Sequence, residues 1–185
     1  LGIFALNHIN PQGSFFGLMS KSGAFGLLSM VLYVLAYTPL KRISPFAITV
    51  GAIPGAIPFL LGFVAATDDF GIAAGTLFAI QFFWQYPHFI AIAWVQDGEY
   101  KKAGFKMMLG GEKGKYPTSI GVFTSVLMTI ISIAPFLWKI PLLALSVYGA
   151  IIVFFLGVWF TSKAVKLHQN CDDVTARTLM LSSFA

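Results

Sequence analysis

Long apolar stretches alternate with short polar ones along almost the whole chain. A helix needs roughly 17–25 residues to cross the hydrocarbon core of a bilayer, which predicts five spanning helices at 22–37, 46–66, about 71–95, 118–138 and 142–162. Shorter apolar pieces predict parts of two more helices at 1–6 and 178–185. Backbone polar groups inside lipid must be hydrogen-bonded within their own segment, so the pattern indicates an all-α, polytopic transmembrane helix bundle.

Prolines and aspartates mark several of the expected helix ends. Pro39 is expected to stop the first helix, and Pro141 to open the fifth. Pro117 is expected in the first turn of the fourth helix, where a missing N–H costs nothing. Two pairs of aspartates are predicted to cap the helices that follow them: Asp68 with Asp69, and Asp172 with Asp173.

The composition supports a membrane protein and excludes several other classes. Hydrophobic residues make up 57% of the 185, and charged residues only 10%, against roughly 25% in soluble domains. One cysteine, Cys171, excludes a disulfide framework and an all-cysteine metal site. The net charge of +5 is spread between apolar runs. We therefore expect the protein to lie in a lipid bilayer and not to bind nucleic acid.

The basic residues lie almost entirely on one side of the expected bundle. Numbering the loops alternately places only Lys21 and Lys139 on one side. The other side receives the remaining ten, which by the positive-inside rule is the cytoplasmic side: Lys41, Arg42, Lys101, Lys102, Lys106, Lys113, Lys115, Lys163, Lys166 and Arg177.

Residues 1–185 are expected to form a single transmembrane domain. The opening LGIFAL has the character of a helix already in progress, and ARTLMLSSFA begins an apolar run close to the last residue. We therefore expect the domain to be incomplete at its N-terminal end and also at its C-terminal end.

The second expected helix contains the repeated unit GAIPGAIP. Four residues advance a helix by about 400°, so Gly51 and Gly55 share one face and Pro54 and Pro58 another. The GxxxG spacing predicts close approach of a neighbouring helix. The prolines free carbonyl groups, which is tolerated where protein or a water-lined cavity covers them, so they indicate a cavity.

The third expected helix carries a polar stripe at Gln81, Gln85, His88, Gln96 and Glu99. A single histidine in an apolar helix is usually a hydrogen-bonded core residue. Several polar side chains on one face of a spanning helix instead favour an internal cavity or pathway, because such groups are costly in lipid.

A group of charges follows this helix: Asp97 and Glu99, then Tyr100, Lys101 and Lys102. Neighbouring carboxylates near a cavity suit Mg²⁺, which takes one or two protein carboxylates and completes its shell with water and phosphate oxygens. Lys41 and Arg42, on the neighbouring inner loop, add positive charge for a polyanion. These residues predict a diphosphate and metal site, while the alternative is that the charges only anchor helix ends.

Four blocks of sequence resemble those of a known family: YTPLKR (37–42), GAIPGAIPFLLGFVAAT (51–67), WQYPHF (84–89) and EYKKAGFKMM (99–108). In this order they resemble the protohaem IX farnesyltransferases, a branch of the UbiA-type intramembrane prenyltransferases. The resemblance implies a nine-helix bundle, about five helices of which are complete here. It also implies transfer of a farnesyl group from farnesyl diphosphate to a vinyl group of haem b, giving haem O.

The resemblance also implies roles for particular residues. Two acidic motifs hold Mg²⁺ with the diphosphate: the first would precede residue 1, so a chain beginning at Leu1 is expected to be inactive, and the second matches Asp97 and Glu99. Glu99 stands where aspartate is expected, and Lys101 stands where the wider superfamily has a second aspartate. The expected catalytic residues are Lys41, Arg42, Asp97, Glu99 and Tyr100. The expected substrate-binding residues are Tyr37, Trp84, His88, Lys101, Lys102 and Arg177.

Two other functions compete with haem farnesylation. A relative in the same superfamily would prenylate an aromatic acceptor such as 4-hydroxybenzoate. A transporter subunit would also carry a polar stripe and helices broken by proline. The resemblance places the protein in a membrane, with the bacterial plasma membrane favoured over the mitochondrial inner membrane, and names haem A synthase and oxidase assembly proteins as candidate partners.

Overall fold

The computed structural model describes residues 2–9, 14–15 and 19–184, and most of them are helical. The first elements are α1 (Gly2–Asn7) and two short antiparallel strands, β1 (Ser14–Phe15) and β2 (Met19–Ser20). The helices that follow are α2 (Lys21–Val31), the π-helix η1 (Leu32–Tyr37), α3 (Thr38–Ile43), α4 (Ala47–Thr67), α5 (Ile72–Val95), α6 (Asp97–Lys102), α7 (Lys115–Leu137), α8 (Val147–Asn170) and α9 (Asp173–Ser182).

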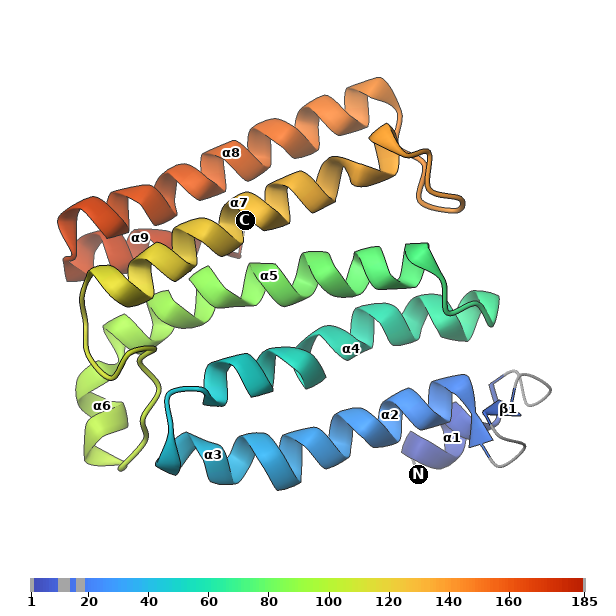
Figure 1. Ribbon diagram of the computed structural model, residues 1–185, viewed down its shortest axis with the longest axis horizontal. Coiled ribbons are helices and arrows are strands. Elements are labelled where there is room, and N and C mark those ends of the chain that lie inside the picture. The colour runs from blue at the N-terminus through green and yellow to red at the C-terminus, as the bar shows by residue number, and fades with distance from the viewer. Residues whose placement is uncertain (1, 10–13, 16–18, 185) are drawn as a thin grey trace.

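The long helices lie side by side in one row. In Figure 1 the order from top to bottom is α8, α7, α5, α4 and α2, with α9 behind, and each neighbouring pair is in contact. The middle helix, α5, packs against α4, α7 and α9. This all-α bundle is the fold class that the sequence predicts.

Four helical segments of the described chain are long and apolar enough to cross a membrane: Lys21–Ile43, Ala47–Thr67, Lys115–Leu137 and Val147–Asn170. The protein is therefore an integral membrane protein. The third expected span, α5, forms as a 24-residue helix. It is not among the four, since Gln81, Gln85 and His88 make it less apolar, so five complete spans stay a prediction.

Three expected helix ends are wrong, and one of them is the end of the last long helix, which runs on to Asn170 rather than stopping at 162. The first helix continues through Pro39 to Ile43, because the residues before the proline form a π-helical turn. In that turn the missing N–H of Pro39 does not break an α-helical hydrogen bond. Thr38 instead donates its backbone N–H and its hydroxyl to the Tyr33 carbonyl. The last long helix begins at Val147 rather than near Pro141, because the Ser146 hydroxyl caps it by accepting the Gly149 N–H.

The remaining expected ends are mostly confirmed. Helices α4 and α5 begin within one residue of the expected positions, and Pro117 lies in the first turn of α7. Asp172 caps α9 by accepting the Thr175 N–H. Asp68 does not cap α5: it ends α4 in a left-handed conformation, and its carboxylate lies 3.2 Å from Lys21 Nζ.

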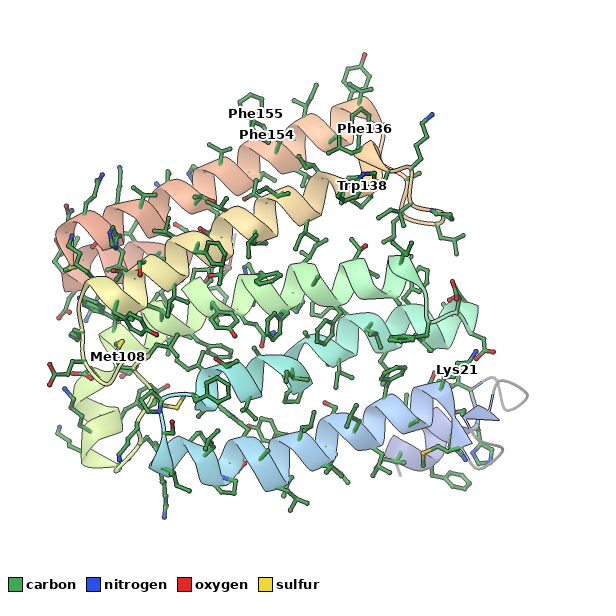
Figure 2. All side chains as sticks on the ribbon, viewed as in Figure 1. Lys21, Met108, Phe136, Trp138, Phe154 and Phe155 are labelled. Carbon is green, nitrogen blue, oxygen red and sulfur yellow. The ribbon has the colours of Figure 1, made fainter. Side chains whose placement is uncertain are left out.

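Helix α2 and helix α4 run antiparallel, with a register fixed by contacts along their length. Lys21 meets Asp68 at one end, Ser29 Oγ donates to the Pro54 carbonyl in the middle, and the Tyr37 ring covers Gly51 towards the other end. Figure 2 shows Lys21 at one end of the bundle and Met108 at the opposite end, near α6. The charged segment α6 therefore lies at the end where α3 stops.

Candidate functional site

A cavity of about 530 Å³ lies between the α2–η1 segment and α4, with α5 behind it. Its volume is within the range of roughly 300–1,000 Å³ that small-molecule sites occupy. Apolar and small side chains form most of the wall, with a few polar groups among them: Gly26, Ser29, Met30, Tyr33, Val34, Tyr37, Ile48, Gly51, Pro54, Gly55, Gln85, Phe89 and Met107.

The two glycines of the GAIPGAIP unit make room for side chains and not for a neighbouring backbone. A Cβ on Gly51 would lie 2.6 Å from the Tyr37 ring, and one on Gly55 would lie 2.1 Å from Gln85 Oε1. The expected helix-to-helix contact across GxxxG is therefore wrong in its detail. Each glycine instead lets a large side chain from another helix reach the cavity wall.

The proline-rich stretch of α4 borders this cavity, as expected. Pro58 has no N–H to give to the Pro54 carbonyl, and Ser29 Oγ donates to that carbonyl at 3.1 Å instead. Gln85 is buried and donates its amide to the carbonyls of Ala52 and Gln81, at 3.1 and 3.2 Å. The expected polar groups beside a cavity are thus present, and they hold helices together.

A second pocket, of about 270 Å³, opens at the charged end of the bundle. Met107 is buried and lines both this pocket and the larger cavity, so the two hollows lie on either side of one side chain. Four polar side chains contribute to its wall: Asp97, Tyr100, Lys101 and Lys106.

The two expected metal ligands differ in where they point. Asp97 is only 18% exposed, lines the charged pocket and pairs with Lys101 at 2.8 Å. Glu99 is 70% exposed and pairs with Lys102, itself 75% exposed, at 2.8 Å. Asp97, Lys101 and Tyr100 therefore share one pocket, whereas Glu99 and Lys102 form a surface pair outside it.

Lys41 and Arg42 lie at the same end of the bundle, gathered around one aromatic ring. Lys41 Nζ lies 5.5 Å from the centroid of the Phe105 ring and 4.8 Å from that of Tyr37, and the Arg42 guanidinium lies 5.8 Å from that of Phe105. The Lys106 N–H donates to the Lys41 carbonyl at 2.7 Å. The loop after α6 is thereby fixed to the end of α3, which brings the cations beside the charged pocket.

Electrostatic interactions modify two groups of this pocket. The Asp97 carboxylate, by its hydrogen bond and its charge, raises the pKa of the Lys101 ammonium above its usual value, so Lys101 is a fixed cation at neutral pH. Burial raises the pKa of the Tyr100 hydroxyl, which is therefore neutral and available as a hydrogen-bond donor.

His88 and Trp84 lie on the other side of α5, away from both hollows. His88 is buried, its Nδ1 lies 2.7 Å from Ser183 Oγ, and its ring stacks on Trp84 at 4.7 Å and meets the edge of Phe184. Trp84 and Ser183 line a separate groove of about 230 Å³. Arg177 is exposed on α9. The polar stripe therefore divides, with Gln85 facing α4 and His88 facing α9.

A family comparison now decides the class of the protein. The UbiA prenyltransferase family matches residues 8–184. The chain belongs to this family.

Curated relatives of this UbiA-family chain carry the name protoheme IX farnesyltransferase. The protein of Flavobacterium psychrophilum is 47% identical over 184 residues, which are 100% of this chain and 58% of that protein. The protein of Christiangramia forsetii is 42% identical, over 99% of this chain and 58% of that protein. That of Koribacter versatilis is 37% identical, over 91% and 56%. The chain thus spans less than two thirds of these relatives. No solved structure matches it.

The charged pocket has a donor set that can be compared with the needs of a magnesium ion. No group of three or more His, Cys, Asp or Glu side chains gathers within the described ranges. Asp97 is a single pocket-lining carboxylate, and Mg²⁺ commonly needs only one or two, with phosphate oxygens and water in its other positions. The donor set therefore fits magnesium through Asp97.

Sequence reasoning missed four residues that line the cavity or the charged pocket: Ser29, Phe105, Lys106 and Met107. Ser29 belongs to a series of small and aromatic residues at helical spacing, Gly26, Ser29, Tyr33 and Tyr37, which was a readable signal for a cavity wall. Phe105 and Met107 lie in an irregular loop, where no periodicity reveals which side chains turn inward.

Proposed function

We propose that the protein transfers a farnesyl group from farnesyl diphosphate to a vinyl group of haem b, giving haem O and diphosphate. The observation that carries this proposal is the pairing of an apolar cavity with a charged pocket on either side of Met107. A farnesyl diphosphate molecule has the same division, a long apolar chain joined to a compact polyanion. The names of the relatives support this choice of donor and acceptor.

In this proposal the charged pocket holds the diphosphate. Asp97 would hold Mg²⁺, which supplies charge neutralisation to the phosphate oxygens when it is bound with them. Lys41, Arg42 and Lys101 supply further positive charge, and Tyr100 donates a hydrogen bond. Fixed cations of this kind stabilise the negative charge that collects on a departing diphosphate.

We propose a smaller role in diphosphate binding for the surface pair of Glu99 and Lys102. Both side chains lie outside the pocket wall and are paired with each other, so they serve as a second layer of charge around the phosphate entrance.

The cavity favours ionisation of the donor and protects the product of that step. When the bond between C1 and the diphosphate oxygen breaks, the electron pair leaves with the diphosphate and the farnesyl chain becomes cationic at C1. Tyr37, Tyr33 and Phe89 line the cavity, and aromatic ring faces attract cations. The vinyl carbon of haem b then forms the new bond, and water adds to the remaining cationic carbon and releases a proton to solvent, which leaves a hydroxyl group.

We propose that His88, Trp84 and Arg177 contact the haem acceptor. His88 and Trp84 belong to the side of α5 that faces α9, and Arg177 is exposed on α9 itself, so a haem that touches His88 and Trp84 approaches from that side. We place the protein in the plasma membrane of a bacterium as a multi-pass protein, with haem A synthase or oxidase assembly proteins as partners of its product.

The test is a product assay on a full-length version of the protein in lipid nanodiscs, with farnesyl diphosphate and Mg²⁺. With haem b as acceptor, mass spectrometry is expected to detect haem O and an equal amount of diphosphate. Farnesylated 4-hydroxybenzoate, formed in place of haem O, would move the protein to the aromatic branch of the family. Absence of diphosphate release with every acceptor would favour the transporter instead.

A further inference from the structure

Small side chains at matching levels of two helices create the cavity between α2 and α4. On α2 these are Gly26 and Ser29, and on α4 they are Gly51 and Gly55. The antiparallel register places Tyr37 beside Gly51 near the charged end and Gly26 beside Leu61 farther along. The cavity is therefore elongated along the helices, with one end at the charged pocket and the other deep in the bundle.

Two leucine side chains lie beside Gly26, at the end of the cavity farthest from the charged pocket. A Cβ placed on Gly26 would lie 2.6 Å from Leu6 Cδ1 and 3.7 Å from Leu61 Cδ1, so these two side chains occupy the space next to Gly26. Beyond them a separate apolar cluster fills the gap between α2, α4 and α5. It consists of Leu60, Val64 and Ala74, with Phe25, Phe63 and Phe78 packed against it.

The distance between the two ends can be taken from the helix. Tyr37 and Gly26 are eleven positions apart, and the α-helical rise of 1.5 Å per residue gives an upper bound of about 16 Å between them, since the π-helical residues of η1 rise less. Ser29 lies eight positions from Tyr37, or about 12 Å. The difference of about 4 Å is close to the length of one isoprene unit, so Ser29 lies beside the last unit of a chain that fills the cavity.

We propose that Leu6 and Leu61 form a floor that sets the length of the isoprenoid the cavity accepts, with Ser29 at the level of the third isoprene unit. This proposal rests on the proposed function, since it names the part of the same site that measures the donor. A chain of three units reaches from the charged pocket to the floor. A chain of two units leaves the deep end unfilled, and a chain of four units must displace the leucines.

The test measures donor preference in two variants of the full-length protein that change the cavity in opposite directions. Geranyl, farnesyl and geranylgeranyl diphosphate compete for haem b, and the ratio of kcat/KM values is read from the products. Ser29→Phe fills the third-unit level and is expected to shift the ratio towards geranyl on the order of tenfold. Leu61→Ala lowers the floor and is expected to shift it towards geranylgeranyl by a similar factor.

Three control variants separate length measurement from general damage. Ser29→Ala removes the hydroxyl bond to Pro54 without adding bulk, and it is expected to keep the wild-type donor order. Leu28→Phe and Phe59→Ala alter exposed neighbours on the same two helices that do not line the cavity, and they are expected to do the same. Leu61→Ala removes bulk and cannot overfill the cavity, so its donor preference can be measured even where Ser29→Phe fails to fold.

The outcomes distinguish the two proposals. Wild-type farnesyl transfer combined with an unchanged donor order in Leu61→Ala and in folded Ser29→Phe overturns the length proposal alone. Absence of prenyl transfer from all three donors by the wild-type protein overturns the proposed function, and the length proposal with it. Opposite shifts in the two variants, with unchanged controls, support the floor.

Discussion

The backbone N–H of Lys106 donates a hydrogen bond of 2.7 Å to the carbonyl of Lys41. This bond joins the loop after α6 to the last turn of α3, two segments that are far apart in the sequence. It fixes Phe105 under the Lys41 and Arg42 cations and leaves Met107 between the cavity and the charged pocket. The positions of the two cations and of the loop that lines the charged pocket are therefore tied together by this main-chain contact.

Replacing Lys106 by proline tests this contact. Lys106→Pro removes the N–H, and we expect it to lower farnesyl transfer on the order of tenfold or more relative to Lys106→Ala, because small displacements of aligned groups are costly. Lys106→Ala keeps the backbone donor and loses only the side chain. Steady-state rates of both variants in nanodiscs provide the measurement, and equal rates would show that the bond has no positioning role.

Mutations can distinguish the roles of Asp97 and Glu99, because Asp97 lines the pocket and Glu99 is exposed. We expect Asp97→Asn to lower turnover on the order of a hundredfold or more, because it removes the one carboxylate in the pocket wall. Glu99→Gln is expected to cost less, since its side chain is 70% exposed. Diphosphate release over a range of Mg²⁺ concentrations is the measurement. A larger loss in Glu99→Gln would assign the metal to Glu99 instead.

Gly55 tests how tightly Gln85 fills the wall of the cavity. Gly55→Ala places a methyl group 2.1 Å from Gln85 Oε1, so we expect it to destabilise the protein by about 1–3 kcal/mol. The double variant with Gln85→Ala should recover part of this loss, since the clash is then absent. Gly62→Ala is the matched control, because nothing lies within 4 Å of its added Cβ. Thermal unfolding in one detergent compares the four proteins.

The hydrogen bond between Trp94 at the end of α5 and Asp173 at the start of α9 is expected to depend on pH. Lys113, by its hydrogen bond and charge, and Trp94, by its indole N–H, hold the pKa of Asp173 below its usual value of 3.8. A carboxyl with a lowered folded-state pKa contributes stability above its unfolded pKa, and this contribution is lost as the pH falls through the folded pKa. The link should therefore be intact at neutral pH and weaken only below about pH 4.

Trp94 fluorescence measures this titration directly, because its Nε1 lies 3.0 Å from Asp173 Oδ1. We expect an acid transition below 3.8 that moves upward in Lys113→Gln and is absent in Asp173→Asn. Replacing the other three tryptophans by phenylalanine isolates the signal. A transition that stays in place without Lys113 would contradict the assignment of the pKa shift to that lysine.

Much of the fold follows from simple features of the sequence. The boundaries of α4 and α5 were predicted within one residue, because polar and turn-forming residues interrupt the apolar runs there. The end of the first helix was not, because Pro39 stops an α-helix but is accommodated by a preceding π turn that no sequence pattern indicates. The start of α8 depended on the Ser146 cap, which competed with the stronger signal of Pro141.

The site was predictable in its parts and less so in its arrangement. Asp97, Lys101 and Tyr100 share a pocket because they lie on one short helix. Glu99 turns outward because its position on that helix is about 200° from Asp97, which helical spacing alone could have indicated. His88 and Gln85 were expected on one polar face, but their hydrogen-bond partners lie on α9 and α4, and only tertiary packing decides this.

The most direct test of the central claim is to locate the bound farnesyl chain. A farnesyl diphosphate analogue with a diazirine on its last isoprene unit is cross-linked to the full-length protein in nanodiscs, and the labelled peptides are sequenced. Labelling is expected around Ser29 and Met30 of α2 and Pro54 of α4, and excess unlabelled farnesyl diphosphate should abolish it. Specific labelling around Trp84 and Trp159 in the groove beside α9, with none between α2 and α4, would contradict the account.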